Sequence, residues 1–297
     1  MPRPITVAVA GATGRQGGAL CRWLLNRGHA VRALTRKPGS SAALELEALG
    51  AVVHEADLDD GRAVGLAVEG ADAFFLVTTP FEAGVQAEVR QGRAAAKIAK
   101  EVGVKHLVYA SVANADRNTG VPHVESKREV EDYIRKLGVA STTIAPVFFM
   151  ENFLGPNFID GLRAGTLSMP LRPNRRLQMV AVQDIASFAG MVLERPTEFV
   201  GRRIDIASDS LTGPEIAGAM TRTGTTIVYV QAPVEPIRSR NPDFARMWEW
   251  FDQRGTDVDL SALASAYPEA GWHDFGHWVR EQDWTVLDAA GPEQPTA

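Results

Sequence analysis

The stretch GATGRQG, residues Gly11–Gly17, follows a short apolar run, Ile5–Ala10, and leads into a helical pattern, Gln16–Arg27. A strand, a glycine turn and a helix in this order present backbone N–H groups and the positive end of a helix dipole to a phosphate. Glycine lets the phosphate approach the backbone closely. The spacing is G-x-x-G-x-x-G, and its place at the first strand-to-helix turn predicts a dinucleotide phosphate site. The alternative is a tight turn with a purely structural role.

Strand and helix patterns continue to alternate beyond this turn. Short apolar runs without polar alternation fit parallel strands that are covered on both faces, joined by right-handed helical crossovers. The sequence therefore predicts an α/β fold, a doubly wound parallel sheet of the Rossmann type with a smaller C-terminal α+β lobe. The predicted strands are residues 5–10, 30–35, 51–56, 73–78, 106–111 and 141–146, and the predicted helices are 16–27, 41–49, 61–68, 85–102 and 125–137.

The regular alternation ends after Pro146. We expect residues 1–150 to form the cofactor-binding Rossmann domain and residues 151–297 to form a smaller substrate or partner lobe, with residues 178–208 returning to the first domain. The lobe is rich in aromatic residues, which could line an apolar pocket or simply fill a core; we favour core packing. The polar tail 291–297 is expected to be disordered.

Composition narrows the classes of function. The chain has 297 residues, a formal net charge of −5 and one cysteine, Cys21. A mildly acidic chain is a poor candidate for direct nucleic-acid binding, which needs clustered Lys and Arg. Cys21 lies in an apolar helical pattern and is expected to be a buried, inert thiol, and no metal site is predicted because no Cys/His metal spacing is recognised. Without a signal peptide or an apolar run long enough for a membrane span, the sequence predicts a cytoplasmic protein.

The residues after the second predicted strand indicate which cofactor is bound. NAD sites place an Asp or Glu there to accept hydrogen bonds from the ribose, whereas this chain has Arg36 and Lys37. Two cations can bind a 2′-phosphate, Arg36 bidentately, and Arg15 in the glycine turn adds a third. NADP(H) is therefore favoured over NAD(H). The alternative is a solvated basic loop.

Polar and turn-forming residues also follow the other predicted strands. Each taken alone could be a cap or a turn former, but the carboxyl ends of strands are where ligands bind in open α/β sheets. These positions are Asp57 and Leu58, where the adenine would lie, Thr78, Thr79 and Pro80 after the fourth strand, and Ser111 at the end of the fifth.

Five stretches together resemble the NmrA-like proteins, atypical members of the short-chain dehydrogenase/reductase superfamily, and in particular their NADP(H)-binding redox sensors. They are GATGRQGGAL, TRKP, VTTPFE followed by QAEVRQG, HVESKREVEDY and PVFFMENFL, and the similarity extends from about Ile5 to the C-terminal aromatic helix. The resemblance implies a cleft between a Rossmann domain and a smaller lobe. It also implies NADP(H) contacts at Gly11, Thr13, Gly14, Arg15, Gln16, Gly17, Arg36, Lys127, Pro146, Phe149 and Asn152.

The stretch HVESK, His123–Lys127, bears on catalysis. Catalytic members of that superfamily carry a tyrosine four residues before the lysine, and here the position is His123. Positions i and i+4 share a helix face, so Lys127 can still hold the nicotinamide ribose beside His123. An imidazole can donate a proton at neutral pH, and the residues leave open whether His123 is such an acid or has no chemical role. Tyr109 and Tyr133 have the wrong spacing to replace the missing phenol.

Two functions follow for a chain of this kind. The resemblance and the missing tyrosine favour an NADP(H)-binding redox sensor or regulator with little or no catalysis, which acts on a regulatory protein. The alternative is an NADPH-dependent reductase of a small apolar quinone, carbonyl or enone. Neither function involves direct contact with nucleic acid or with a membrane.

Overall fold

The computed structural model describes residues 3–221 and 224–287, so the tail 291–297 lies outside the described residues. The chain divides into two compact units. The first unit comprises Met1–Pro146, Val182–Ile206 and Glu269–Gly271, and the second comprises Val147–Ala181, Ala207–Pro268 and Trp272–Ala297.

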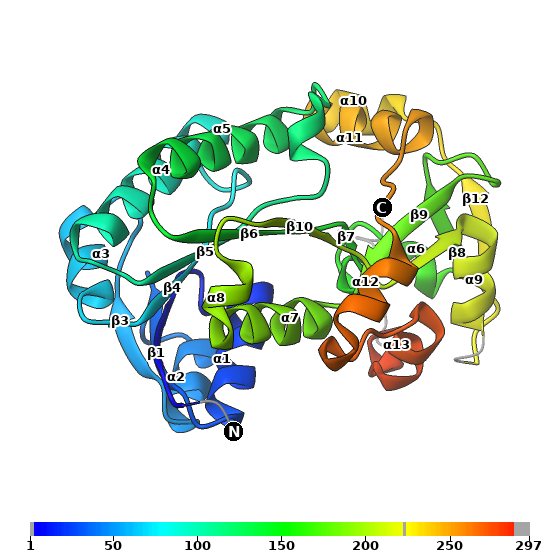
Figure 1. Cartoon of the computed structure of the whole chain (residues 1–297). Helices are drawn as coiled ribbons and strands as arrows, with labels where there is room; N and C mark the ends of the chain where they lie inside the picture. Colours follow the sequence, from blue (N-terminus) through cyan, green and yellow to red (C-terminus); the bar gives the residue numbers. More distant parts are fainter. Residues whose placement is uncertain (1–2, 222–223, 288–297) are drawn as a thin grey trace, which may run out of the picture. The chain divides into compact units, whose positions relative to one another are not determined.

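A parallel sheet forms the centre of the first unit, as predicted (Figure 1). Its order is β10-β6-β5-β4-β1-β2-β3, so the connections run outward in both directions from the neighbours β1 and β4. Ligands of doubly wound sheets bind at the carboxyl ends of the strands near such a switch point. The strands are β1 (Thr6–Val9), β2 (Ala30–Thr35), β3 (Val52–Glu55), β4 (Ala73–Val77), β5 (His106–Ala110), β6 (Ser141–Pro146) and β10 (Arg203–Ile206).

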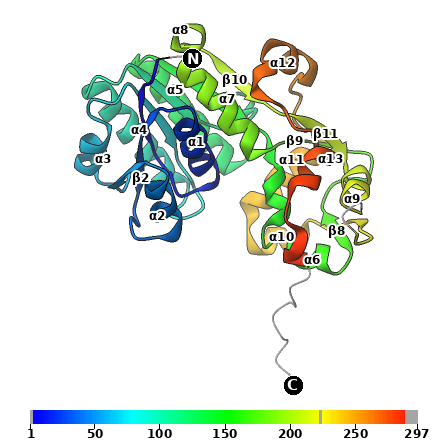
Figure 2. The ribbon, with the colours of Figure 1, turned by 90° about the horizontal axis from the view of Figure 1, so that it is seen from below.

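Helices cover both faces of this sheet, because its strands are apolar on both sides. Helix α4 packs against α5 on one face, and α1 packs against α7 on the other (Figures 1 and 2). Glycines allow both close contacts: a Cβ at Gly92 would lie 2.7 Å from the Val130 side chain, and one at Gly190 would lie 2.2 Å from the Trp23 ring. The helices are α1 (Arg15–Asn26), α2 (Ser41–Ala48), α3 (Gly61–Val68), α4 (Val85–Glu101), η1 (Ala115–Arg117), α5 (Pro122–Leu137), α7 (Val182–Glu194) and α8 (Pro196–Phe199).

Helix α5 starts earlier than predicted. Glu125 was expected to open it, but the helix begins at Pro122. Proline fits the first helical position because its fixed φ suits a helix and its missing N–H has no helical partner there. His123 therefore lies inside the first turn of α5, one turn before Lys127.

The second unit is built from short elements. One small sheet has the order β11-β9-β7, and β8 pairs in parallel with β12. Its strands are β7 (Phe148–Phe149), β8 (Thr166–Met169), β9 (Arg176–Val180), β11 (Asp209–Thr212) and β12 (Val228–Gln231). Its helices are η2 (Met150–Leu154), α6 (Ile159–Arg163), α9 (Gly213–Thr221), α10 (Glu235–Arg240), α11 (Pro242–Gln253), α12 (Leu260–Ala266), α13 (Phe275–Glu281) and η4 (Trp284–Leu287), and η3 (Pro268–Ala270) lies where the chain passes between the units.

Aromatic side chains fill the core of the second unit. Phe153, Trp248, Phe275 and Trp278 are buried in one apolar cluster, as the core-packing interpretation predicts. The Trp278 indole donates a hydrogen bond to Glu151 Oε1 at 3.1 Å, so its polar atom is satisfied inside the unit. Among the described residues, no helix combines the length and hydropathy that a membrane crossing requires.

Candidate functional site

The glycine turn is tight. Gly11 adopts a positive φ of 61°, and its carbonyl oxygen accepts a hydrogen bond from the Gly14 N–H at 2.9 Å. A Cβ at Gly17 would lie 2.3 Å from this oxygen, so the turn itself excludes a side chain there. Gly14 is the N-cap of α1 in an extended conformation, and as a glycine it has no side chain to cap the first-turn N–H groups. A helix N-terminus that follows a glycine turn is the usual form of an anion-binding site.

Gln16 provides a test of whether a cofactor fits this turn. Its Oε1 is buried and has no hydrogen-bond partner among the described residues. A buried acceptor without a partner costs about 1–3 kcal/mol, and a ligand hydroxyl or amide would remove that cost. Nearby, the hydroxyls of Thr13 and Thr35 lie 3.3 Å apart and join the turn to the end of β2. The residues of the turn therefore fit a nucleotide cofactor.

Arg36 already has an anionic partner. Its Nη2 lies 2.6 Å from Glu82 Oε2 in the segment after β4, and both side chains are 54% exposed. Arg36 and Lys37 do follow β2 directly, and the Lys37 N–H donates to Thr35 Oγ1 at 3.2 Å. A 2′-phosphate that binds Arg36 would compete with the Glu82 carboxylate.

Several predicted residues at the next strand ends stabilise local turns. Asp57 Oδ1 accepts from the Asp59 N–H at 2.9 Å, and Thr79 Oγ1 accepts from the Phe81 N–H at 3.3 Å. The Pro80 carbonyl accepts from the Gly84 N–H at 2.9 Å. Leu58 packs against the apolar core of the first unit. These interactions shape the carboxyl edge of the sheet. Contacts of these residues with a cofactor stay predictions.

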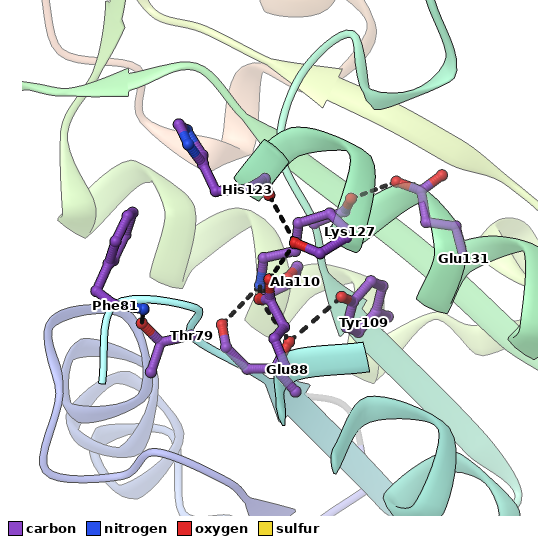
Figure 3. A network of polar contacts seen from close by, with 11 residues as sticks. Thr79, Phe81, Glu88, Tyr109, Ala110, His123, Lys127 and Glu131 are labelled. Carbon is purple, nitrogen blue, oxygen red and sulfur yellow. Dashed lines mark hydrogen bonds and ion pairs between the residues drawn. The ribbon is translucent and has the colours of Figure 1, made fainter. Parts of the chain in front are cut away.

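Lys127 is the centre of a buried polar network (Figure 3). Its Nζ lies 2.6 Å from the Thr78 carbonyl oxygen, 2.9 Å from Glu88 Oε1 and 3.3 Å from the Ala110 carbonyl oxygen. It also lies 5.5 Å from the centre of the Tyr109 ring. An ammonium has three N–H donors, so these acceptors can use all of them. Lys127, which was predicted to hold the nicotinamide ribose, is therefore already bound by groups of the protein itself.

Glu88 is the buried counter-ion of this lysine, and it is not among the residues predicted from the sequence. Its carboxylate is fully buried and accepts from Thr78 Oγ1 at 3.0 Å and from Ser126 Oγ at 2.5 Å, besides pairing with Lys127. The sequence offered one signal for Glu88, its position: it lies on the face of α4 that otherwise carries small or apolar residues such as Gly92 and Ala95. An acid on such a face needs a partner.

His123 lies on the same helix but in different surroundings. It is 9% exposed, and its ring centre lies 5.6 Å from that of Phe81, with the planes tilted by 54°. Tyr109 cannot replace the missing phenol because it is fully buried. Burial, together with the charge of Glu88, raises the pKa of Tyr109 well above its ordinary value. A role of His123 as the acid stays a prediction.

Ser111 and the loop after β5 form a second polar group. Ser111 donates a short hydrogen bond to Glu131 Oε1, and Glu131 Oε2 pairs with Arg203 Nε at 2.9 Å. Burial raises the pKa of Glu131, and Arg203 opposes that shift. Asn114 is 1% exposed, and neither polar atom of its amide has a partner in the described part of the chain. Sequence reasoning missed Asn114, since asparagine in a loop normally signals only a turn.

The remaining predicted residues fall in both units. Arg15 is exposed at the start of α1, and the Pro146 carbonyl at the end of β6 accepts from the Ala113 N–H at 3.0 Å. Phe149, in β7, and Asn152, in η2, belong to the second unit. The first unit thus brings together the glycine turn, Arg36 and Lys127 at the carboxyl edge of one sheet. Contacts of Phe149 and Asn152 with the same cofactor stay predictions.

Comparison with known proteins agrees with this architecture. The chain is 26% identical over 269 residues to an NmrA-like family domain-containing protein of Dictyostelium discoideum, covering 84% of this chain and 88% of the relative. It is 29% identical over 234 residues to an NAD(P)H azoreductase of Xenophilus azovorans, covering 78% and 79%. The crystal structure of NmrA, a negative transcriptional regulator, in complex with NADP superposes with a TM-score of 0.82 at 24% identity, covering 98% of both chains, and shows the shared fold. The model of the NmrA-like family matches residues 4–278, and this chain belongs to that family.

Proposed function

We propose that this protein binds NADP(H) at the carboxyl edge of the first-unit sheet and acts as a redox-sensing or regulatory protein with little or no hydride transfer. One observation carries the proposal: Lys127 is neutralised by the buried Glu88 and bound to backbone carbonyls, while His123 stands where a catalytic phenol would be. A lysine that stabilises its own fold and lacks the phenol next to it is suited to binding rather than to proton transfer.

Cofactor binding is supported by the chemistry of the site. The first turn of α1, whose N-cap Gly14 has no side chain, offers N–H groups to the pyrophosphate, and Gln16 Oε1, which has no partner among the described residues, offers an acceptor. Arg36 offers a cation to a 2′-phosphate at the end of β2, where NAD sites have an acid. Of the two Lys127 contacts with backbone carbonyls, the one with Ala110 is the longer at 3.3 Å, so a ribose hydroxyl could replace it without breaking the ion pair with Glu88.

Two measurements on the wild-type protein test the proposal. Calorimetric titration should show binding of NADPH that is at least tenfold tighter than that of NADH. NADPH oxidation, followed by absorbance against a panel of quinones, aldehydes and enones, should stay at the rate of the protein-free control. Failure to bind NADPH would overturn the cofactor assignment, and rapid turnover of any substrate in the panel would overturn the regulatory one.

Reductase activity is the second candidate, and a specific observation favours it. His123 and Phe81 form an aromatic pair at the edge of the sheet, and a flat substrate could stack there beside a proton donor. One relative is named as an NAD(P)H azoreductase. If His123 is the general acid, His123→Ala should lower turnover by about a hundredfold or more with unchanged NADPH affinity. Equal turnover of the two proteins would remove His123 from the reaction.

A further inference from the structure

Three potential metal ligands lie together in the second unit, outside the site described above. They are His273, His277 and Glu281, and their ligand atoms all lie within 4.8 Å of one another. His277 Nε2 lies 3.1 Å from Glu281 Oε1, and His273 Nε2 lies 3.7 Å from Glu281 Oε2. The two imidazole rings are 5.0 Å apart, centre to centre. Both rings thus present Nε2 to opposite oxygens of one carboxylate.

No metal site was predicted from the sequence, yet the spacing of these three residues is regular. His273, His277 and Glu281 follow one another at intervals of four residues. Residues four apart on a helix lie on one face, and a pair of histidines at this interval can share one ion. His273 stands just before the cap of α13, and the other two lie within that helix.

The backbone that carries these side chains is firmly anchored. Asp274 caps α13 by accepting from the His277 N–H at 2.7 Å, and Asp209 accepts from the Phe275 N–H at 2.7 Å. On the opposite side of the helix, Phe275, Trp278 and Val279 are buried in the core of the second unit. The spacing of the ligands is therefore set by the fold, and little backbone order has to be gained when an ion binds.

The distances suit a small transition-metal ion. Zn–N and Zn–O bonds of about 2.0–2.2 Å in a tetrahedron put neighbouring ligand atoms roughly 3.3–3.6 Å apart. The two nitrogen-to-oxygen distances, 3.1 Å to one carboxylate oxygen and 3.7 Å to the other, lie close to that range, and side-chain rotation would bring all three ligands onto one ion. The side chains are accessible, since His277 is 49% exposed, Glu281 46% and His273 14%.

We propose that His273, His277 and Glu281 bind one divalent transition-metal ion, with water completing its coordination. Two imidazoles and one carboxylate are a donor set for Zn²⁺, Ni²⁺ or Cu²⁺, whereas Mg²⁺ and Ca²⁺ prefer oxygen ligands throughout. The ion joins the residue before the cap of α13 to the last residue of that helix, so it fixes the helix at both ends. This site is independent of cofactor binding in the first unit.

Calorimetric titration of protein without a histidine tag, at pH 7.5, tests the proposal with ZnCl₂, NiCl₂ and MgCl₂. We expect one Zn²⁺ or Ni²⁺ per chain at micromolar affinity, no response to Mg²⁺, and a rise in the melting temperature when Zn²⁺ is added. His277→Ala and Glu281→Gln should each weaken binding at least tenfold. Both positions are exposed, so circular dichroism should show intact folds, and either variant alone is decisive if the other unfolds.

Matched controls come from a histidine and an acid elsewhere in the chain. His54→Ala removes a half-buried histidine of β3, and Glu45→Gln removes an exposed acid that pairs with Arg22. Both controls should bind Zn²⁺ like the wild type. The proposal is overturned if the wild type binds neither Zn²⁺ nor Ni²⁺ at 100-micromolar concentrations. It is equally overturned if the folded His277→Ala and Glu281→Gln variants retain wild-type affinity, or if only the controls lose it.

Discussion

At the scale of single residues, two charged pairs at the carboxyl edge of the sheet differ in what surrounds them. The Lys127–Glu88 pair is buried, with side-chain exposures of 11% and 0%, so removing either charge leaves the other one buried without a counter-ion. The Arg36–Glu82 pair is half exposed, and solvent screens it. A ligand can therefore displace Glu82 from Arg36 far more easily than it can displace Glu88 from Lys127.

Removing one member of the buried pair should destabilise the protein strongly. Lys127→Met leaves the Glu88 carboxylate buried without a counter-ion, and we expect the free energy of unfolding to fall by about 3–5 kcal/mol in urea titration. The double variant Lys127→Met/Glu88→Gln should recover most of that loss. It should still bind NADPH less tightly than the wild type. If the folded double variant binds NADPH as tightly as the wild type, Lys127 does not contribute to the cofactor site.

Arg36 and Glu82 should have opposite effects on cofactor preference. Arg36→Ala loses a charged phosphate contact, so NADPH affinity should fall ten- to a hundredfold, about 1.4–2.7 kcal/mol, with little change for NADH. Glu82→Gln removes a competitor for Arg36 and should tighten NADPH binding by about two- to fivefold, the range of an exposed ion pair. Calorimetric titration measures both, with Glu45→Gln as the control. Equal effects of Arg36→Ala on NADPH and NADH would contradict this role.

At the scale of elements, the glycine turn contains one glycine that the turn itself requires, Gly17, and one that the proposed phosphate site requires, Gly14. Gly17→Ala would force a Cβ to 2.3 Å from the Gly11 carbonyl oxygen, so this variant should lose stability even without cofactor. A Cβ at Gly14 would lie 3.2 Å from the same oxygen, and the extended backbone there suits any residue. Gly14→Ala should keep its melting temperature within a few degrees and bind NADPH at least tenfold more weakly. Unchanged affinity of Gly14→Ala would show that the turn has only a structural role.

The elements of the first unit were largely predictable, and those of the second were not. β2, α3 and β6 have the predicted bounds, because apolar runs and glycine or proline stops mark them in the chain itself. β7 and β12 have only two and four residues and are ordered by partners distant in sequence, so no local period reveals them. Glu88 was missed for a similar reason, since its partner Lys127 is 39 residues away and meets it only in the fold.

At the scale of the whole molecule, Cys21 reports on the opening of the first unit. It is fully buried in α1, and burial raises the pKa of its thiol to about 12. At pH 8 a thiol reagent should therefore react with Cys21 only when the unit unfolds. The rate of this labelling can be measured in mild urea. NADPH should slow that labelling in proportion to its saturation of the site, because it binds the folded form alone. Rapid labelling of the native protein would contradict the burial of Cys21.

The first unit is discontinuous, and this has a consequence for synthesis on the ribosome. β10 pairs with β6, and α7 packs against α1, yet both follow β6 only after 35 residues of the second unit, Val147–Ala181. Until residue 206 has left the exit tunnel, β6 is an open sheet edge, and until residue 194 has left it, α1 lacks its covering helix. Open edges recruit strands from other chains. Nascent chains stalled when Pro146 has left the tunnel but residue 206 has not should therefore depend on chaperones, whereas chains that have emerged beyond residue 206 can close the sheet themselves.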